Sequence, residues 1–456
     1  MLKLSFVLSS IEACNVSKYK DIDFSGISTD SNKILGDELF FALKGERLDG
    51  HNFISDALDR GAQGAVVEKD GYDSKNGKII IRVPSTFKAL GDLAQAWRGK
   101  FQSLKLAAIT GSNGKTTTKE MVSSILSLRH SVLKNSGNFN NLIGLPLTLL
   151  KLTGDHNAAV VELGMNDFGE IKRLTEISNP DIGAITNVGK AHLEKLGSIE
   201  GVAKAKGELI EGFDETNAFV VNMDDPLIRR IAGSVKCIKI PYGIESHGVV
   251  VSARDIMIDG FSAISFKMNI EGREFPARMR GIGIHNVMNA LCASGIALLF
   301  GCSDEEIQAG LERYSPVYMR MEVLDSPFGF KIINDTYNSN PDSMRGAVEE
   351  LIRLKSKGRT IAVLGDMLEL GNESMTEHRM LGEFLRELGV DYVIAYGKFG
   401  RCVLEGFGEK SRGFYAETHE DAAEKLKNYA GTEDLVLVKG SRGMKMENVI
   451  QRLFKE

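Results

Sequence analysis

The chain has 456 residues, of which 43% are hydrophobic and 26% charged, and its formal net charge is −5. These values predict a soluble globular protein of about two to four domains, and the negative charge argues against a general nucleic-acid binder. Five scattered cysteines without paired spacing, no membrane-length apolar run and no leader-like start favour a cytoplasmic enzyme that does not insert into membranes.

Residues 1–102 are expected to form a small α/β unit. Helices are predicted at 53–60 and 86–101, and short strands at 65–68 and 78–83. The unit also contains a cluster of short polar side chains: Ser28, Thr29, Asp30 and Ser31. Such a cluster can form a turn or bind a polar ligand, and the residues alone leave both interpretations open.

Residues 103–313 alternate between predicted strands and helices. Apolar runs at 105–109, 158–163, 181–186 and 218–222 predict buried strands, and the alternation predicts a mostly parallel sheet with helices on both faces. Two extended runs between 262 and 279, separated near Gly272, predict a hairpin. Because such sheets bind ligands at the carboxyl ends of their strands, functional side chains are expected there.

A glycine-rich turn joins the strand at 105–109 to a helix predicted at 121–128. It contains the run Gly111, Ser112, Asn113, Gly114, Lys115, Thr116 and Thr117. Unpaired backbone N–H groups and the helix dipole favour a polyphosphate at such a turn, Lys115 adds positive charge, and Thr116 can ligate Mg²⁺. Only two residues separate Gly111 from Gly114, where the general phosphate loop has four. An ordinary corner between strand and helix is the alternative.

In this region Glu162, His192 and either of two lysines, Lys204 and Lys206, could ligate a metal. Glu162 ends a predicted strand and offers the hard oxygen that magnesium prefers, with a solvated carboxylate as the alternative. His192 follows another strand, but a lone histidine is more often structural. Lys206 lies with Lys204 on a helix predicted at 201–208, where a solvated basic face is the simpler interpretation. A buried lysine can, however, lose its proton and add carbon dioxide to become a carbamate.

Residues 314–456 predict a second α/β alternation. Strands are expected at 331–334, 361–364, 392–396 and 435–438, and helices at 343–354 and 377–388. This region has no second phosphate loop. Two α/β units that share one phosphate loop suggest a nucleotide bound at a domain interface.

Further polar side chains suit a nucleotide. Asn286 and Asn289 are three residues apart on one predicted helical face and could pair with adenine, or Asn286 could cap the helix. Arg320 could stabilise charge on a γ-phosphate. Asp335 opens a polar loop at 335–343 that could hold ribose or an amine substrate, or form only a turn.

These motifs resemble, in order and over nearly the whole chain, the Mur ligase family of ATP-dependent amide-forming enzymes in peptidoglycan assembly. The matching positions are 110–117, 162–164, 192–194, Lys206, 285–290, Arg320 and Asp335. The short glycine spacing is the family's usual form. The resemblance implies an α/β fold of three domains: a small N-terminal α/β domain at 1–102 for the UDP-muramoyl substrate, a central, mostly parallel-sheet P-loop ATPase domain at 103–313, and a C-terminal Rossmann-like α/β domain at 314–456 that contacts D-alanyl-D-alanine and nucleotide.

The resemblance also implies roles by position. It predicts catalytic roles for Lys115, His192, Lys206 and Arg320. It places ATP on residues 111–117 together with Asn286, Asn289, Arg320 and Asp335. Two Mg²⁺ ions are expected on Thr116, Glu162, His192 and a carbamylated Lys206.

The runs 137–146, 203–208, 337–341 and 438–442 resemble the branch of the family that adds D-alanyl-D-alanine. Substrate contacts are therefore expected at Ser28, Thr29, Asp30 and Ser31 on the uridine side, and at Asn138, Asn140, Asn141, Asn338 and Asn340. Asn32 stands where the family usually has arginine, which leaves its own contacts open.

The implied reaction consumes ATP and joins D-alanyl-D-alanine to UDP-N-acetylmuramoyl-tripeptide through an acyl phosphate, in an enzyme expected to be monomeric. Three alternatives are weighed against it. A phosphotransferase or motor-type NTPase is disfavoured because no strongly apolar strand ends in an Asp-Glu pair. A nucleotide-gated binding module would not need Glu162, His192 and Lys206 together. The uridine-type N-terminal unit argues against a folylpolyglutamate synthase.

Overall fold

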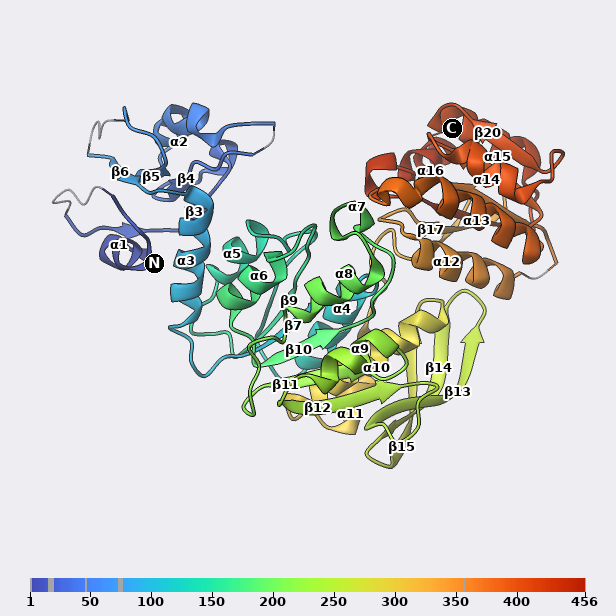
Figure 1. Ribbon diagram of the computed structural model, residues 1–456, viewed down its shortest axis with the longest axis horizontal. Coiled ribbons are helices and arrows are strands. Elements are labelled where there is room, and N and C mark those ends of the chain that lie inside the picture. Colours follow the sequence, from blue (N-terminus) through green and yellow to red (C-terminus); the bar gives the residue numbers. More distant parts are fainter. Residues whose placement is uncertain (1, 15–19, 46, 73–76, 356, 456) are drawn as a thin grey trace. The chain divides into compact units, whose positions relative to one another are not determined.

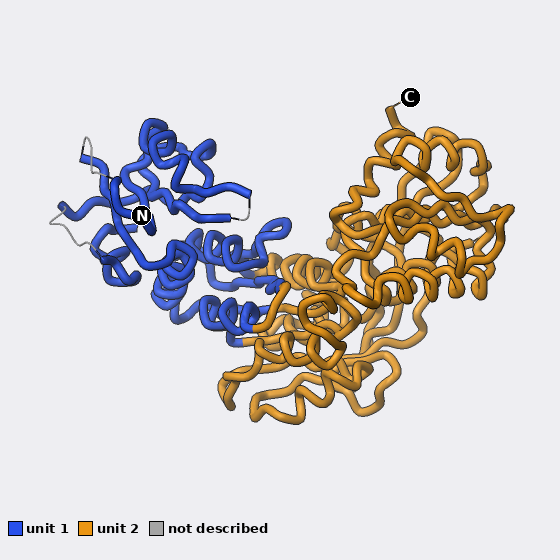
Figure 2. Tube along the Cα trace, turned by 45° about the horizontal axis from the view of Figure 1, so that its top comes forward, with its two compact units in different colours: residues 1–108, 130–165, 169–181 blue, residues 109–129, 166–168, 182–456 orange. Residues whose placement is uncertain are grey.

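The computed structural model describes residues 2–14, 20–45, 47–72, 77–355 and 357–455. Contacts within the chain divide these residues into two compact units, coloured separately in Figure 2. Within those limits, unit 1 comprises residues 1–108, 130–165 and 169–181, and unit 2 comprises residues 109–129, 166–168 and 182–456.

The first part of unit 1 is a small α/β fold (Figure 1). Its elements are β1 (Leu2–Lys3), α1 (Leu4–Ser10), β2 (Asp23–Phe24), β3 (Ile27–Ser28), β4 (Leu39–Phe41), α2 (Ile54–Asp59), β5 (Gly64–Val67), β6 (Ile79–Arg82) and α3 (Thr86–Arg98). Strands β3 to β6 pair in parallel, in that order. The predicted strands at 65–68 and 78–83 are thus confirmed, and the helix predicted at 53–60 is α2, preceded by a 3₁₀ turn at Gly50–Phe53.

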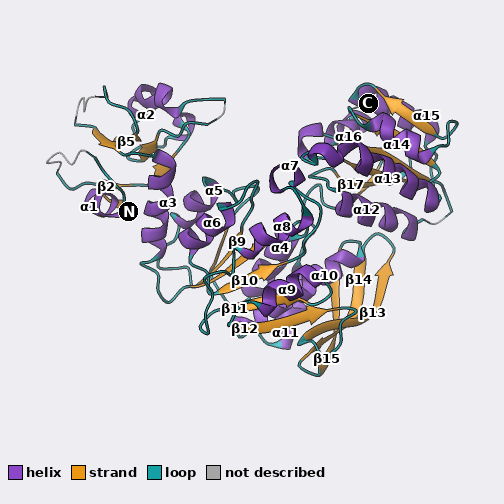
Figure 3. Ribbon diagram, in the orientation of Figure 1, coloured by secondary structure: helices purple, strands orange, loops and turns teal. Residues whose placement is uncertain are grey.

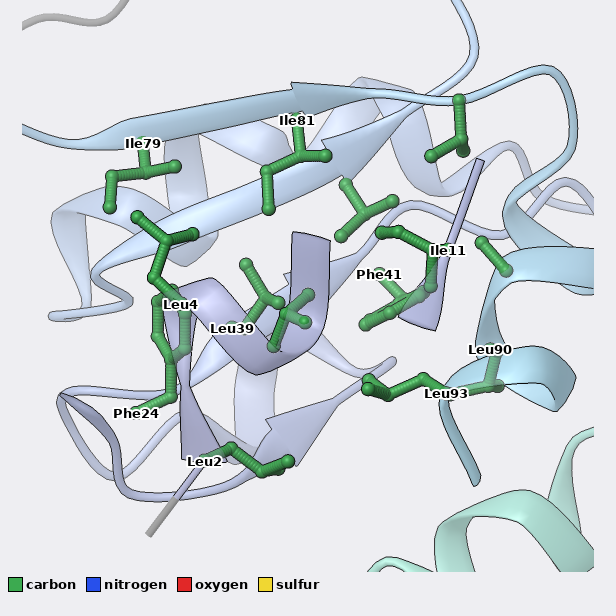
Figure 4. Packing of buried hydrophobic residues seen from close by; sticks show 14 of the residues in the cluster. Leu2, Leu4, Ile11, Phe24, Leu39, Phe41, Ile79, Ile81, Leu90 and Leu93 are labelled. Carbon is green, nitrogen blue, oxygen red and sulfur yellow. The ribbon is translucent and has the colours of Figure 1, made fainter. Parts of the chain in front are cut away.

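An apolar core joins this sheet to helices α1 and α3. Figure 4 shows Phe24, Phe41, Ile81 and Leu90 packed together, and none of these side chains is measurably exposed. Helix α3 contributes Leu90 and Leu93 to this core. Ser85 caps the start of the helix by accepting a hydrogen bond from the Lys88 backbone N–H, which stabilises the helix over these apolar residues. The helix ends at Arg98, earlier than the predicted end at 101.

The second part of unit 1 contains β8 (Val132–Lys134), α5 (Gly144–Leu149), β9 (Ala158–Glu162) and α6 (Glu170–Ser178). Strands β8 and β9 pair in parallel, and α3 packs on both α5 and α6. Every residue of β9 is buried, as expected for a parallel strand covered on both faces, and this confirms the strand predicted at 158–163.

Strand β7 (Lys105–Thr110) runs from the first segment of unit 1 into unit 2, whose first residue is Ile109. The elements there are α4 (Lys115–Leu126), β10 (Ile182–Ile185), α7 (Leu193–Leu196), α8 (Ile199–Gly207), β11 (Ala218–Asn222), α9 (Pro226–Gly233), β12 (Ile238–Gly243), β13 (Val251–Asp259), β14 (Ala263–Ile270), β15 (Arg273–Arg280), α10 (Ile284–Leu299) and α11 (Asp304–Arg313). Strands β10 to β13 pair in parallel, whereas β13, β14 and β15 are antiparallel and form the long arrows in Figure 3. The predicted hairpin is confirmed as β14 and β15.

The C-terminal part of unit 2 is a second α/β sheet. Its elements are β16 (Glu322–Asp325), β17 (Lys331–Asp335), α12 (Pro341–Arg353), β18 (Thr360–Leu364), α13 (Ser374–Glu387), β19 (Tyr392–Tyr396), α14 (Gly400–Phe407), β20 (Gly413–Ala416), α15 (His419–Tyr429), β21 (Leu435–Lys439) and α16 (Glu447–Phe454). The strand order is β16-β17-β21-β18-β19-β20, with only β16 antiparallel among these described strands. The four strands predicted here are confirmed, and the edge strands β16 and β20 were not predicted.

The α/β fold class with mostly parallel sheets is therefore confirmed. The domain boundaries at 102/103 and 313/314 stay predictions. Within the part of the chain that the structure describes, no helix combines the length and the apolar character needed to cross a membrane.

Candidate active site

The turn after β7 requires its two glycines. Gly111 and Gly114 both have positive φ angles, +150° and +80°. A Cβ atom at Gly111 would lie 1.9 Å from Thr186 Oγ1, and one at Gly114 would lie 2.2 Å from Asn289 Oδ1. A side chain at either position would meet these neighbours and strain a backbone of positive φ, so glycine is strongly favoured at both positions.

The same loop is fixed to the end of strand β10. Thr186 donates its backbone N–H to Thr110 O at 2.9 Å and its hydroxyl to Asn113 O at 2.5 Å. The Asn113 N–H in turn donates to Asn187 Oδ1 at 2.9 Å. Lys115 folds back over the loop, with Nζ 2.7 Å from Gly111 O. These contacts hold the predicted phosphate-binding residues in one rigid turn at the carboxyl end of a strand.

Helix α10 brings the predicted adenine residues to this turn. Asn289 Oδ1 accepts a hydrogen bond from Thr118 Oγ1 at 3.3 Å, and Asn289 Nδ2 donates to Asn286 Oδ1 at 3.1 Å. The two asparagines thus share one helical face, as their spacing predicts. Gly283, not Asn286, is the residue that precedes the helix, and Asn286 Nδ2 donates to Ile282 O.

Lys206 is a buried amine on helix α8. Its side chain is only 2% exposed, and burial, helped by the positive charge of Lys115, holds the pKa of Lys206 well below its usual value. Lys204, on the same helix, is exposed, with its Nζ 5.8 Å from the centre of the Phe168 ring. Burial therefore favours the neutral, nucleophilic form of the Lys206 amine, whereas Lys204 is exposed to solvent.

His192 directly precedes helix α7 and contacts an acidic residue that the sequence did not single out. Its backbone is left-handed, with φ of +56°, and its Nδ1 lies 2.6 Å from Glu369 Oε2. Hydrogen bonding to His192 holds the pKa of Glu369 below its usual value. The Glu194 N–H also donates to Glu369 O at 3.1 Å. The signal in the sequence that could have indicated Glu369 is its position five residues after the buried strand β18, where functional side chains are expected.

Glu162 lies in unit 1 and is only 3% exposed. Its Oε1 accepts a hydrogen bond from Asn140 Nδ2 at 2.8 Å, so the predicted residues Asn140 and Glu162 touch. Asn141 instead accepts hydrogen bonds from the backbone N–H groups of Ile143 and Gly144 at the start of α5. Asn138 is exposed.

The predicted metal ligands divide between the two units. Thr116, His192 and Lys206 belong to unit 2, whereas Glu162 belongs to unit 1, so the complete ligand set stays a prediction. No group of three or more His, Cys, Asp and Glu side chains that could hold a metal occurs among the described residues.

The C-terminal part of unit 2 reaches the phosphate loop through Arg320. Its Nη2 donates to Thr116 Oγ1 at 2.9 Å, and its guanidinium carbon lies 4.1 Å from the centre of the Tyr337 ring. Met319 and Met321, on either side of Arg320, both have left-handed backbones with φ of +61° and +50°. The cation is therefore held at the phosphate loop by a sharply turned segment.

Asp335 ends β17 with both carboxylate oxygens engaged. Oδ1 accepts a hydrogen bond from the Met321 N–H at 3.1 Å, and Oδ2 forms an ion pair with Lys439. Lys439 lies opposite Asp335 on β21, is only 2% exposed, and also donates to Asn338 O at 3.0 Å. The sequence did not indicate Lys439 as a partner, because the contact depends on strand pairing across about a hundred residues.

Asn340 caps helix α12 and contacts the phosphate loop. Its Oδ1 accepts a hydrogen bond from the Ser343 N–H at 2.9 Å, and its Nδ2 donates to Asn113 Oδ1 at 2.9 Å. Asn338 Oδ1 accepts a longer hydrogen bond from the Arg442 N–H, at 3.4 Å. The polar loop after β17 thus forms a capped turn, while its ligand contacts stay a prediction.

The polar cluster in unit 1 also forms a turn. Ser28 Oγ donates to Asp30 O at 3.0 Å, and Asp30 Oδ1 accepts a hydrogen bond from the Asn32 N–H at 3.0 Å. A 3₁₀ turn at Ser31–Lys33 follows. These local bonds give Ser28 and Asp30 a structural role, and the role of Ser28, Thr29, Asp30 and Ser31 in substrate binding stays a prediction.

Comparisons with known proteins decide the family. Residues 23–98 match the catalytic domain of the Mur ligase family, residues 109–297 the Mur ligase middle domain, and residues 319–442 the Mur ligase glutamate ligase domain. The chain is 36% identical over 443 residues to the UDP-N-acetylmuramoyl-tripeptide--D-alanyl-D-alanine ligase of Bacillus subtilis, covering 96% of this chain and 95% of that one. The chain belongs to the Mur ligase family.

Other Mur ligases are similar over the same length. The enzyme of Haemophilus influenzae with the same name is 34% identical and covers 99% of both chains. A crystal structure of MurF from Acinetobacter baumannii superposes with a TM-score of 0.90 at 33% identity, covering 99% of this chain and 98% of that one. MurF from Thermotoga maritima in complex with ADP gives 0.84 at 29% identity, covering 94% and 97%. This chain therefore has the three-domain α/β fold of these Mur ligases, with a central parallel-sheet domain and a separate C-terminal domain.

Proposed function

We propose that this chain is an ATP-dependent ligase of peptidoglycan synthesis that joins D-alanyl-D-alanine to UDP-N-acetylmuramoyl-tripeptide, releasing ADP and phosphate. The observation that carries the proposal is the convergence on one phosphate loop of a cation, Arg320, and a polar loop, through Asn340, from the C-terminal part of unit 2. Relatives named for this ligation, similar along the full chain, support it.

In this proposal, each of the three parts of the chain binds a different substrate or part of a substrate. Residues 1–102 bind the UDP-muramoyl group through the cluster at Ser28–Ser31. Residues 103–313 bind ATP, with its phosphates on the turn at 111–117 and adenine at Asn286 and Asn289. Residues 314–456 contact the ribose through Asp335 and the dipeptide through the loop containing Asn338 and Asn340. We expect a monomer that works in the cytoplasm.

The donor chemistry fits two magnesium ions held by Thr116, Glu162, His192 and Lys206. Glu162 is a buried carboxylate whose orientation Asn140 fixes. Lys206 is a buried amine whose lowered pKa favours the neutral form, which can react with carbon dioxide to give a carboxylate-like ligand. A carbamate would thus supply the hard oxygens that a lysine lacks. Bound magnesium would neutralise charge on the phosphate oxygens.

The residues of this chain would act mainly by positioning and charge. The terminal carboxylate of the tripeptide attacks the γ-phosphorus of ATP, and two anions repel each other as they approach. Lys115 and Arg320, both at the phosphate loop, would offset this repulsion. The amine of D-alanyl-D-alanine then attacks the acyl phosphate and phosphate leaves. Because water also attacks acyl phosphates, the loops around the site must exclude it.

An acceptor-dependence assay tests the proposal. Phosphate release from ATP should require magnesium, UDP-N-acetylmuramoyl-tripeptide and D-alanyl-D-alanine together. Omission of any one component should reduce release to background, because the carboxylate accepts the phosphoryl group and the amine drives turnover. Equal release with single amino acids, or with no acceptor at all, would contradict this function.

A further inference from the structure

The side chains of Asn113 and Asn340 form a reciprocal amide pair. Asn340 Nδ2 donates to Asn113 Oδ1 at 2.9 Å, and Asn113 Nδ2 donates back to Asn340 Oδ1 at 3.4 Å. Asn113 lies in the phosphate loop, whereas Asn340 lies 227 residues later at the start of helix α12. Two side chains expected to bind different substrates therefore bind each other.

Each member of the pair is also fixed on its own side. The backbone of Asn113 donates to Asn187 Oδ1 and accepts from Thr186 Oγ1, so the phosphate loop holds its position. Asn340 caps α12 by accepting from the Ser343 N–H, and its own N–H donates back to Ser343 Oγ at 3.0 Å. Asn340 is only 7% exposed. The pair thus links two fixed elements, and the Asn340 side chain cannot turn away without also losing its bond to the Ser343 N–H.

Asn340 belongs to the same short loop as Asn338, the proposed contact for the dipeptide. Lys439 holds the carbonyl of Asn338, and Ser441 Oγ donates to Ser339 O at 3.2 Å. Asn340 is only two residues from Asn338, so its bond to Asn113 helps to hold this loop, including Asn338, near the phosphate loop. We call the loop at residues 338–340 the acceptor loop. We propose that Asn113 and Asn340 are positioning residues that hold this acceptor loop against the phosphate loop for the second chemical step, in which the amine attacks the acyl phosphate. This inference rests on the proposed function.

The second step decides between ligation and loss of the intermediate. In the first step a bond forms between the carboxylate oxygen and the γ-phosphorus, the bond from that phosphorus to ADP breaks, and ADP leaves. In the second step the amine nitrogen bonds to the carbonyl carbon, the carbon–oxygen bond breaks, phosphate leaves and the amine releases a proton. If the acceptor loop moves away, water takes the place of the amine and regenerates the carboxylate, so that ATP is consumed without an amide.

The ratio of phosphate released to amide formed measures this positioning. Wild-type enzyme should give a ratio near one. Asn340→Ser keeps a residue that caps helices well but cannot reach Asn113, and Asn113→Ala breaks the same pair without touching the cap. Each variant should raise the ratio, and the KM for D-alanyl-D-alanine, by about fivefold. Because Asn340 lies outside the phosphate loop, Asn340→Ser should leave the Kd for ADP within about twofold of the wild-type value. The double variant should be no worse than either single one.

A helix-capping residue elsewhere in the C-terminal part of unit 2 provides the control. Thr418 caps α15 by accepting from the Asp421 N–H, and Thr418→Ser should leave the ratio near one. Ratios near one in both single variants would overturn the inference. So would a double variant in which the increases in the ratio seen for the two single variants multiply. A wild-type enzyme that forms no amide would overturn the proposed function itself, which distinguishes the two failures.

Discussion

Lys204 and Lys206 lie on the same helix, α8, but only Lys206 is buried. Positions two residues apart point to different sides of a helix, so one side chain faces solvent and the other faces the interior. Burial and the charge of Lys115 lower the pKa of Lys206, which favours the neutral form of its amine. Carbamate formation requires a neutral amine, and the buried environment of Lys206 favours that form.

Replacing Lys206 should remove activity in a way that added carboxylate can repair. We expect Lys206→Ala to lower ligation by more than about 100-fold, because a proposed metal ligand is lost. Millimolar acetate or formate should restore part of the activity by occupying the vacated space. Lys204→Ala is the matched control and should keep wild-type activity. Full activity of Lys206→Ala without added acid would contradict a carbamate at this position.

The buried amine should also make stability depend on pH. Lys206 has a folded pKa well below 10.5, its usual value, so unfolding takes up a proton between these two values. Because the unfolded state binds more protons there, the stability of the wild-type protein should rise as pH rises toward 10.5. Lys206→Met removes this contribution to the pH dependence of stability. Urea unfolding at pH 7 and pH 10 in carbon dioxide-free buffer should show a larger gain for the wild-type protein, and equal gains would contradict the argument.

The buried ion pair between Lys439 and Asp335 should be costly to break from one side. Lys439→Met leaves the Asp335 carboxylate without its cation, and we expect a loss of about 3 kcal/mol. Adding Asp335→Asn should recover most of this loss, because no buried charge remains, but should not recover ADP affinity. Thermal unfolding and ADP titration measure the two effects. Lys331→Met, at a more exposed ion pair with Asp325 on the same sheet, is the control and should cost under about 1 kcal/mol.

Arg98 should be a structural requirement of unit 1. Its guanidinium donates to the carbonyls of Ser178, Phe101 and Leu104, and the side chain is only 5% exposed. Arg98→Ala leaves these carbonyls without that donor, and we expect a loss of about 3 kcal/mol. Hydrogen exchange should speed up most at residues 98–104 and 178–181. Arg278→Ala, at an exposed arginine, should change nothing measurable, and equal effects of both variants would contradict this role.

The sequence predicted the elements whose signal is local. Buried parallel strands such as β9, β11 and β21 are continuous apolar runs, so their positions follow from the residues alone. Edge and surface strands lack that signal. Strand β13 alternates poorly, contains a register shift between Arg254 and Met257, and has a left-handed residue, Asp255, within it. Strands β16 and β20 are four residues long and lie at the edges of their sheet.

In the site, too, the sequence predicted the local motif but not the contacts between residues that are far apart in the chain. The glycine-rich turn could be identified because glycine, lysine and threonine occur together in a short run. The contacts of Glu369 with His192, of Lys439 with Asp335 and of Asn340 with Asn113 join residues more than a hundred positions apart. Such contacts depend on strand order and helix placement, which no local pattern specifies.

Oxygen transfer from the tripeptide tests the central claim most directly. UDP-N-acetylmuramoyl-tripeptide labelled with ¹⁸O in its terminal carboxylate would be incubated with the enzyme, magnesium, ATP and D-alanyl-D-alanine, and the products analysed by mass spectrometry. If the reaction is ligation through an acyl phosphate, each pentapeptide formed should be matched by one phosphate that carries an ¹⁸O atom from the carboxylate. Unlabelled phosphate, or labelled phosphate without the pentapeptide product, would contradict the account.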